Sequence, residues 1–112
     1  TMPIVEAWGG TPIQKNTSTN KSIAGGISVN SPPRIKEVLG IINESKGSAI
    51  SVKESEILEW YYKLPKLEGV FCEPTSATAL AGLDKLVKSG AIKTSEKVLI
   101  PITGSGLKDF ID

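Results

Sequence analysis

The sequence predicts an α/β fold, with a partial doubly wound parallel sheet and helices flanking it. Short apolar runs alternate along the chain with longer segments whose apolar residues recur at helical spacing. Polar segments rich in glycine, proline and asparagine separate the two kinds of run. Strands that alternate with helices favour a parallel sheet with right-handed crossovers. At 112 residues, the chain is expected to form a single domain over residues 1–112.

The N-terminal part is expected to be extended and polar. Residues 4–8 read as a short strand. The polar stretch 9–22 reads as a loop with room for one short helix at 13–16. Residues 23–29 look extended, although Gly25-Gly26 interrupts them. Paired glycines inside a strand indicate a bend or the close approach of another group.

Two helices with a strand between them are predicted next. Ser31-Pro32-Pro33 opens the first helix, because a capping hydroxyl precedes proline in the first turn, and Gly47 stops it. Residues 49–52 follow as a short strand. The second helix covers residues 53–63, and Pro65 is expected to end it, because proline disrupts a helix interior.

The C-terminal part reads as strand, helix and strand. Residues 69–72 are a candidate for a buried strand, and residues 74–89 form a helix closed by Gly90. Residues 98–102 form the last strand. Pro101 lacks a backbone donor, which places it at the edge or the end of that strand.

Composition excludes several classes of function. A net charge of +1 with scattered lysines argues against nucleic-acid binding. The sequence has no histidine, which removes the commonest metal ligand, and no metal site is expected. No apolar run approaches the ~18 residues of a membrane span, and no signal peptide is evident, so we expect a cytoplasmic protein. Cys72, beside Val70 and Phe71, reads as a buried apolar residue.

Candidate site residues follow the predicted strands. Glycines flank Ser105 in Thr103-Gly104-Ser105-Gly106, so backbone N–H groups there can approach a ligand. A plain strand-ending turn explains the same residues. Glu73 precedes a helix, where a carboxylate favours the helix dipole, and that helix is thin because its first turns are rich in alanine.

Three further positions allow a binding interpretation beside a structural one. Gly25-Gly26 is either a bend or a backbone wall against a flat ring. Arg34 lies early in a helix, where a cation is unfavourable with the dipole, and this hints at an anion partner. A solvated surface position is the simpler explanation of Arg34. Lys108 is a further candidate for binding an anion, beside the same surface explanation. The residues alone do not choose between a small-ligand site and a plain domain.

Four segments, in order, resemble the C-terminal part of the threonine synthase family. Ile23-Ala24-Gly25-Gly26-Ile27 is similar to the family's Ile-Ala-x-x-Ile stretch, and residues 52–58 resemble its Val-Ser-x-Glu-Glu-Ile-Leu run. Residues 69–82 match Gly-x-Phe-x-Glu-Pro-x-Ser-Ala-x-x-x-Ala-Gly, and residues 103–109 match Thr-Gly-x-Gly-Leu-Lys-Asp. These enzymes use pyridoxal phosphate and belong to the tryptophan-synthase-β class, fold type II. The resemblance implies that the chain is part of their large cofactor domain.

The resemblance also implies an activity and a set of cofactor contacts. The parent enzyme would convert O-phospho-L-homoserine and water to L-threonine and phosphate. Thr103 would hydrogen-bond the pyridine nitrogen, and a neutral hydroxyl there would leave the ring less electron-poor than a carboxylate. Ala24, Gly25 and Gly26 would line the ring, with Glu73 nearby.

The sequence departs from the family pattern at three positions. Ser105 stands where many relatives carry histidine or asparagine, Lys53 replaces a capping Ser or Thr, and Pro101 interrupts an aliphatic strand. The Schiff-base lysine and the glycine-rich phosphate loop lie in the family's earlier sequence, and neither motif is present. We therefore expect a C-terminal portion that is inactive alone and holds no covalent cofactor.

Three hypotheses remain at this point. The first is a C-terminal fragment of a threonine synthase. The second is a free-standing, non-catalytic α/β association module derived from such an enzyme. The third is a threonine or serine dehydratase relative, against which the Gly-Leu-Lys-Asp ending argues. Because a sheet without its neighbours exposes apolar edges, we expect a homo-oligomer or a complementing N-terminal segment.

Overall fold

The computed structural model describes residues 2–9 and 21–111. The chain divides into two compact units, which are treated separately. The first comprises residues 1–21 and 28–51, and the second comprises residues 22–27 and 52–112. The predicted short helix at 13–16 lies outside the described residues. The single-domain expectation stays a prediction.

The first unit contains two helices that pack together, α1 (Pro3–Trp8) and α2 (Ile35–Glu44). The strand predicted at residues 4–8 is wrong. Pro3 occupies the first turn of α1, where its missing N–H costs nothing, and the Glu6 N–H donates to the Met2 carbonyl at 2.9 Å. The existence of α2 agrees with the prediction, although the helix begins at Ile35 rather than beside Ser31.

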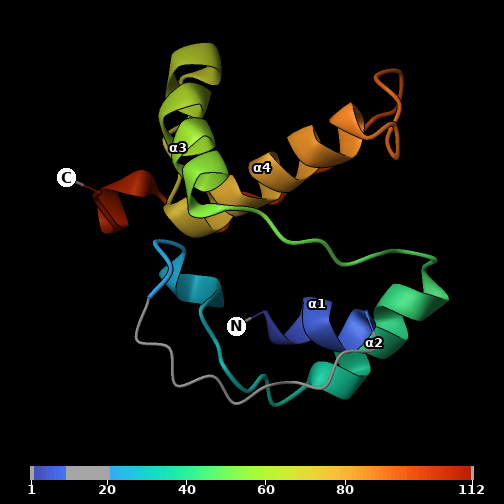
Figure 1. Ribbon diagram of the computed structural model, residues 1–112. Coiled ribbons are helices and arrows are strands. Elements are labelled where there is room, and N and C mark those ends of the chain that lie inside the picture. The colour runs from blue at the N-terminus through green and yellow to red at the C-terminus, as the bar shows by residue number, and fades with distance from the viewer. Residues whose placement is uncertain (1, 10–20, 112) are drawn as a thin grey trace. The chain divides into compact units, whose positions relative to one another are not determined.

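The second unit is built on α3 (Glu54–Glu68) and α4 (Pro74–Lys88), which pack against each other (Figure 1). Two short 3-10 helices, η1 (Gly25–Ile27) and η2 (Gly106–Lys108), complete its described elements. At the start of α3, the Lys53 N–H donates to a Glu56 carboxylate oxygen at 2.6 Å. This is one half of a capping box, and since Lys53 has no side-chain acceptor for the other half, the Glu56 N–H donates to the Lys53 carbonyl at 3.0 Å.

The prediction that Pro65 ends the second helix is wrong, because α3 continues to Glu68. Gly69 ends it instead, with a φ of 66° that few residues other than glycine adopt readily. The Gly69 N–H donates to the Pro65 carbonyl at 3.0 Å. Proline removes only one donor within α3, and Leu64 beside it is buried in the core, so packing offsets that loss.

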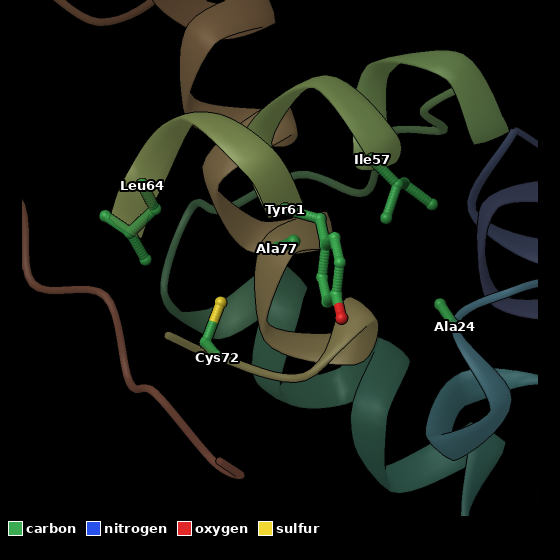
Figure 2. Packing of buried hydrophobic residues seen from close by; sticks show 6 residues of the cluster. All are labelled: Ala24, Ile57, Tyr61, Leu64, Cys72 and Ala77. Carbon is green, nitrogen blue, oxygen red and sulfur yellow. The ribbon is translucent and has the colours of Figure 1, made fainter. Parts of the chain in front are cut away.

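The core of the second unit contains small, aliphatic and aromatic side chains from α3, α4 and the segments beside them. Figure 2 shows its members converging: Ala24, Ile57, Tyr61, Leu64, Cys72 and Ala77. The Tyr61 ring extends from α3 among them and lies 5.4 Å from the Phe71 ring, centroid to centroid. Cys72 is fully buried, as the sequence predicts, and burial raises the pKa of its thiol.

The predicted parallel sheet is not confirmed, since residues 2–9 and 21–111 contain no strand. Residues 49–52 and 98–102 have no regular structure, and residues 23–29 bend into η1. Residues 69–72 contribute one isolated bridge, from Cys72 to Ser105, and that bridge is antiparallel. A strand without neighbours leaves its N–H and C=O groups without partners, so short apolar runs do not form a sheet alone.

Two further features are absent from the part of the chain that the structure describes. Over residues 2–9 and 21–111, no helix has both the length and the apolar character that crossing a membrane requires. Within the same ranges, no cluster of acidic and cysteine side chains has the arrangement of a metal site.

Candidate functional site

The candidate site lies around the first turn of α4, where three segments of the second unit meet. The predicted residue Glu73 directly precedes α4. The segment after residue 102 reaches it through the bridge between Cys72 and Ser105. Two backbone hydrogen bonds frame that bridge, from the Glu73 N–H to the Gly104 carbonyl and from the Gly106 N–H to the Phe71 carbonyl, each 3.0 Å long. The two runs singled out in the sequence are therefore neighbours.

Side chains from both runs form a hydrogen-bonded group, here called the hydroxyl cluster (Glu73, Ser76 and Thr103). The Thr103 N–H donates to Ser76 Oγ at 3.0 Å, and the two hydroxyl oxygens lie 3.0 Å apart. Thr103 Oγ1 also donates to Glu73 Oε1 at 3.1 Å. Ser76 is almost fully buried, whereas Thr103 is exposed. The buried Ser76 hydroxyl and the Glu73 carboxylate thus hold the hydroxyl of an exposed residue in place.

The carboxylate of Glu73 has further contacts that hold it in place. Its Oε2 lies 4.0 Å from Lys108 Nζ, and its side chain is only 12% exposed. That ion pair is weak, because the Lys108 side chain is 77% exposed. A Cβ added at Gly104 would overlap the Glu73 carboxyl group. Glycine at 104 therefore leaves the room that this carboxylate occupies.

The segment with Ala24, Gly25 and Gly26 reaches the same turn of α4. The Gly26 N–H donates to Thr75 Oγ1 at 3.1 Å, and Thr75 is the residue before Ser76. A Cβ on Gly26 would lie 2.8 Å from that oxygen, but a Cβ on Gly25 would meet nothing within 4 Å among the described residues. Close packing against Thr75 therefore requires glycine at position 26. At Gly25, no described atom occupies the space where a side chain would begin.

Glu54 at the start of α3 anchors that segment. One of its carboxylate oxygens accepts from Ser22 Oγ at 2.6 Å, and the other accepts from the Ile23 N–H at 3.0 Å. Ser22 Oγ in turn accepts from the Ala24 N–H at 3.1 Å. Ala24 is fully buried against the core. The five predicted cofactor residues therefore belong to one region of the second unit.

The remaining candidates are placed differently. Ser105 Oγ accepts from the Leu107 N–H at 3.2 Å and so caps η2. Arg34 precedes α2 in the first unit. Lys108 contacts the site through its Nζ, which lies 4.0 Å from Glu73 Oε2.

Sequence reasoning did not single out Ser76, Thr75 or Glu54. Nothing local marks Ser76, because a serine in the first turn of a helix is common. Its importance comes from a residue 27 positions later in the chain. The signal that the sequence offered for Ser76 was that both site segments contain hydroxyl residues.

The residues present suit a flat, nitrogen-containing ring. The hydroxyl of Thr103, an exposed residue, is held by two neighbours, and a Cβ at Gly25 in the same unit would meet nothing within 4 Å among the described residues. Aromatic cofactors are bound by such combinations of apolar or backbone walls and a few fixed polar groups. The described site residues include no lysine or arginine in direct contact with Thr103.

Comparison with known proteins gives one family and a consistent group of relatives. Residues 1–104 match the family described as pyridoxal-phosphate dependent enzyme. The chain is 40% identical to a threonine synthase from Methanosarcina acetivorans, over 96% of this chain and 27% of that protein. It is 38% identical to one from Halalkalibacterium halodurans, over 93% and 30%, and 42% identical to one from a Bacillus species, over 80% and 25%. The chain spans about a quarter of the length of these curated relatives.

Proposed function

The chain belongs to the family of pyridoxal-phosphate-dependent enzymes, and we propose that it is the C-terminal portion of a threonine synthase. The family has an α/β fold of type II and uses pyridoxal phosphate as its cofactor. The proposed reaction converts O-phospho-L-homoserine and water to L-threonine and phosphate. The observation that carries this proposal is the hydroxyl cluster, which lies at the first turn of α4, where the Gly26 N–H also donates to Thr75 Oγ1.

Within that proposal, each residue of the site has a separate task. Thr103 would hydrogen-bond the pyridine nitrogen, and the backbone at Gly25 and Gly26 would line the ring, while Ala24, which is fully buried, would support them from the core. When bound, the cofactor supplies an electron sink for carbanion chemistry next to the amino group of the substrate. Glu73 and Ser76 hold the Thr103 hydroxyl in one place, so the ring meets a fixed partner rather than a rotating side chain.

Complementation tests the proposed activity directly. Residues 1–112 are produced together with the preceding three quarters of the Methanosarcina acetivorans threonine synthase. We expect the pair to release phosphate from O-phospho-L-homoserine. Replacing Thr103 by Val should lower that rate, and the exposed substitution Lys97→Gln should not. A pair that associates but releases no phosphate would count against the proposal, and turnover of threonine or serine instead would favour the dehydratase alternative.

We also propose that residues 1–112 are catalytically incomplete without the preceding sequence. No lysine here stands in the family's Schiff-base motif, and the relatives are about four times longer. The chain alone should give no borohydride-reducible adduct with pyridoxal phosphate beyond nonspecific labelling. A stoichiometric adduct at a single lysine would contradict this.

One observation favours the alternative of an association module. The segment predicted as the last strand exposes its apolar residues, with Leu99 93% exposed and Val98 and Ile102 near 45%. Unpaired apolar segments of this kind bind a further chain. We propose that a complementing N-terminal segment, or a second copy, covers residues 98–102. Light scattering that gives a stable monomer, unchanged when the complementing segment is added, would exclude both.

A further inference from the structure

Residues 22–27, here called the linking segment, connect two stretches of the first unit. That unit comprises residues 1–21 and 28–51, so the chain enters the linking segment from the first unit and then returns to it. A third crossing between the units follows at residues 51 and 52. Because both ends of the linking segment are tied to the first unit, the segment would follow any displacement of that unit unless the second unit holds it.

Glu54 holds the start of the linking segment. Its two carboxylate oxygens accept from Ser22 Oγ at 2.6 Å and from the Ile23 N–H at 3.0 Å. Hydrogen bonds to an ionised acceptor are stronger than bonds between neutral groups. Glu54 also lies two residues after Val52, where the chain returns from the first unit. One side chain therefore joins two of the three crossings.

Thr75 holds the other end of the linking segment. Its Oγ1 accepts from the Gly26 N–H at 3.1 Å, and the next residue, Ile27, is the last of the segment. Thr75 is half-buried in the first turn of α4. Between the two ends, Ala24 is fully buried in the core. All of these contacts lie within the second unit.

We propose that Glu54 and Thr75 are positioning residues that clamp the linking segment at both ends, so that the backbone at Gly25 and Gly26 keeps its place when the first unit is displaced or unfolds. In the proposed function this backbone would line the cofactor ring, and the inference rests on that function for the use of the clamp. The clamp itself requires no cofactor, because every contact in it belongs to this chain.

Amide hydrogen exchange in residues 1–112 tests the clamp directly. Gly40→Pro disrupts the first unit, because a proline inside α2 removes a hydrogen bond and breaks the helix. With both anchors present, exchange at the Ile23 and Gly26 amides should not change. Thr75→Val keeps the shape of the side chain but removes the acceptor. In that background, Gly40→Pro should accelerate exchange at the Ile23 amide about fivefold or more, since one anchor alone no longer holds the segment.

Matched variants on α4 show whether the Thr75 hydroxyl is responsible. Thr78→Val is the control, because it removes another α4 hydroxyl, which bonds the Pro74 carbonyl at 3.1 Å. In the Thr78→Val background, Gly40→Pro should leave exchange at the Ile23 amide unchanged. Thr75→Ser keeps a hydroxyl and should restore the protection that Thr75→Val removes.

A second pair of variants tests the Glu54 anchor in the same way. Glu54→Gln should preserve the clamp, because an amide can accept from the Ile23 N–H and donate to Ser22 Oγ. Glu54→Ala can do neither. In the Glu54→Ala background, Gly40→Pro should accelerate exchange at the Gly26 amide, which lies at the opposite end of the linking segment.

Two results would overturn the clamp. The first is that Gly40→Pro alone accelerates the Ile23 and Gly26 amides. The second is that Gly40→Pro changes neither amide when Glu54→Ala and Thr75→Val are combined. Protection of the Tyr61 amide in α3 reports that the second unit is still folded. If Gly40→Pro unfolds the whole chain, Leu39→Ala at a half-buried position of α2 disturbs the first unit more mildly and takes its place.

A spectroscopic measurement separates this inference from the proposed function. The sample is the complemented enzyme described above, loaded with pyridoxal phosphate, and the readout is the visible circular dichroism of the cofactor. Thr75→Val should reduce that signal, and Thr75→Ser should restore it. If the exchange results hold but Thr75→Val leaves the signal unchanged, the linking segment does not line the ring, and that part of the proposed function fails. If the exchange results fail, the clamp is wrong whatever the complemented enzyme does.

Discussion

The carboxyl group of Glu73 occupies the space that a side chain at position 104 would fill. The two residues are 31 positions apart, and the Glu73 N–H also donates to the Gly104 carbonyl at 3.0 Å. Gly104 does not have a positive φ, so its backbone conformation does not require glycine. The close approach of the Glu73 carboxyl group requires it. The glycine and the carboxylate therefore form one unit of the site.

Gly104→Ala is expected to push the Glu73 carboxylate away from Thr103 and to destabilise the chain by about 1 kcal/mol. In a Glu73→Ala background the same substitution should cost much less, because its clash partner is gone. Urea unfolding of the unsubstituted chain, the two single variants and the double variant measures the coupling energy between positions 73 and 104. Gly40→Ala is the control: it lies inside α2 with open space around it and should stabilise by about 0.5–1 kcal/mol. Strict additivity between positions 73 and 104 would contradict the contact.

Gly26→Ala should be destabilising, whereas Gly25→Ala should be nearly neutral. A Cβ at 26 lies 2.8 Å from Thr75 Oγ1, and the stiff threonine side chain cannot move away without losing its bond to the Gly26 N–H. Overpacking of this kind costs about 1–3 kcal/mol. Thermal unfolding of the two neighbouring variants checks the difference. If both lower the melting temperature equally, backbone flexibility rather than the Thr75 contact explains the glycines.

Glu54→Ala should release the segment that holds Ala24, at a cost of about 1–2 kcal/mol, because two hydrogen bonds to the carboxylate disappear together. Hydrogen exchange at the Ile23 and Ala24 amides should accelerate in the same variant. Glu59→Ala is the matched control from the same helix, since its carboxylate makes an exposed 3.8 Å pair with Lys63. Equal losses in the two variants would show that Glu54 is not a special anchor.

Cys72 should resist alkylation at neutral pH in the folded chain, because burial raises the pKa of its thiol above the ordinary 9.0. The unfolded thiol ionises first as pH rises, so its proton is lost from the unfolded state before the folded one. Stability from this group is therefore present below about pH 9 and declines above it. Comparing the unfolding free energy of the unsubstituted chain and Cys72→Ala across pH 7–10 isolates this contribution. A pH-independent difference would contradict it.

The helices that carry the site were largely predictable, whereas their surroundings were not. Pro74 in the first turn and Gly90 after the last mark α4 by local chemistry, and the structure agrees within a residue or two. Residues 4–8 show the limit: an apolar run of five has no distinguishing period, and Pro3 decides in favour of a helix. Residues 98–102 depend on neighbours for strand pairing, and no local pattern supplies those.

The site residues divide in the same way. Glu73 and Thr103 follow apolar runs and carry polar groups, which made them visible in the sequence. Their bond to each other spans 30 residues, and the contact of Ser76 with Thr103 spans 27, so both depend on a long chain closure. No helical or strand period encodes such a distant pair.

The long separation between the site segments also bears on the order in which the second unit folds. A short connection over residues 69–73 joins α3 to α4, so their contacts require closing only a small loop. The bond from Gly26 to Thr75 spans 49 residues, and that from Ile111 to the Tyr61 hydroxyl spans 50. Because larger loops cost more entropy and slow contact formation, we expect the helical hairpin to assemble early. The hydroxyl cluster then closes late, and partial unfolding opens it before the hairpin separates.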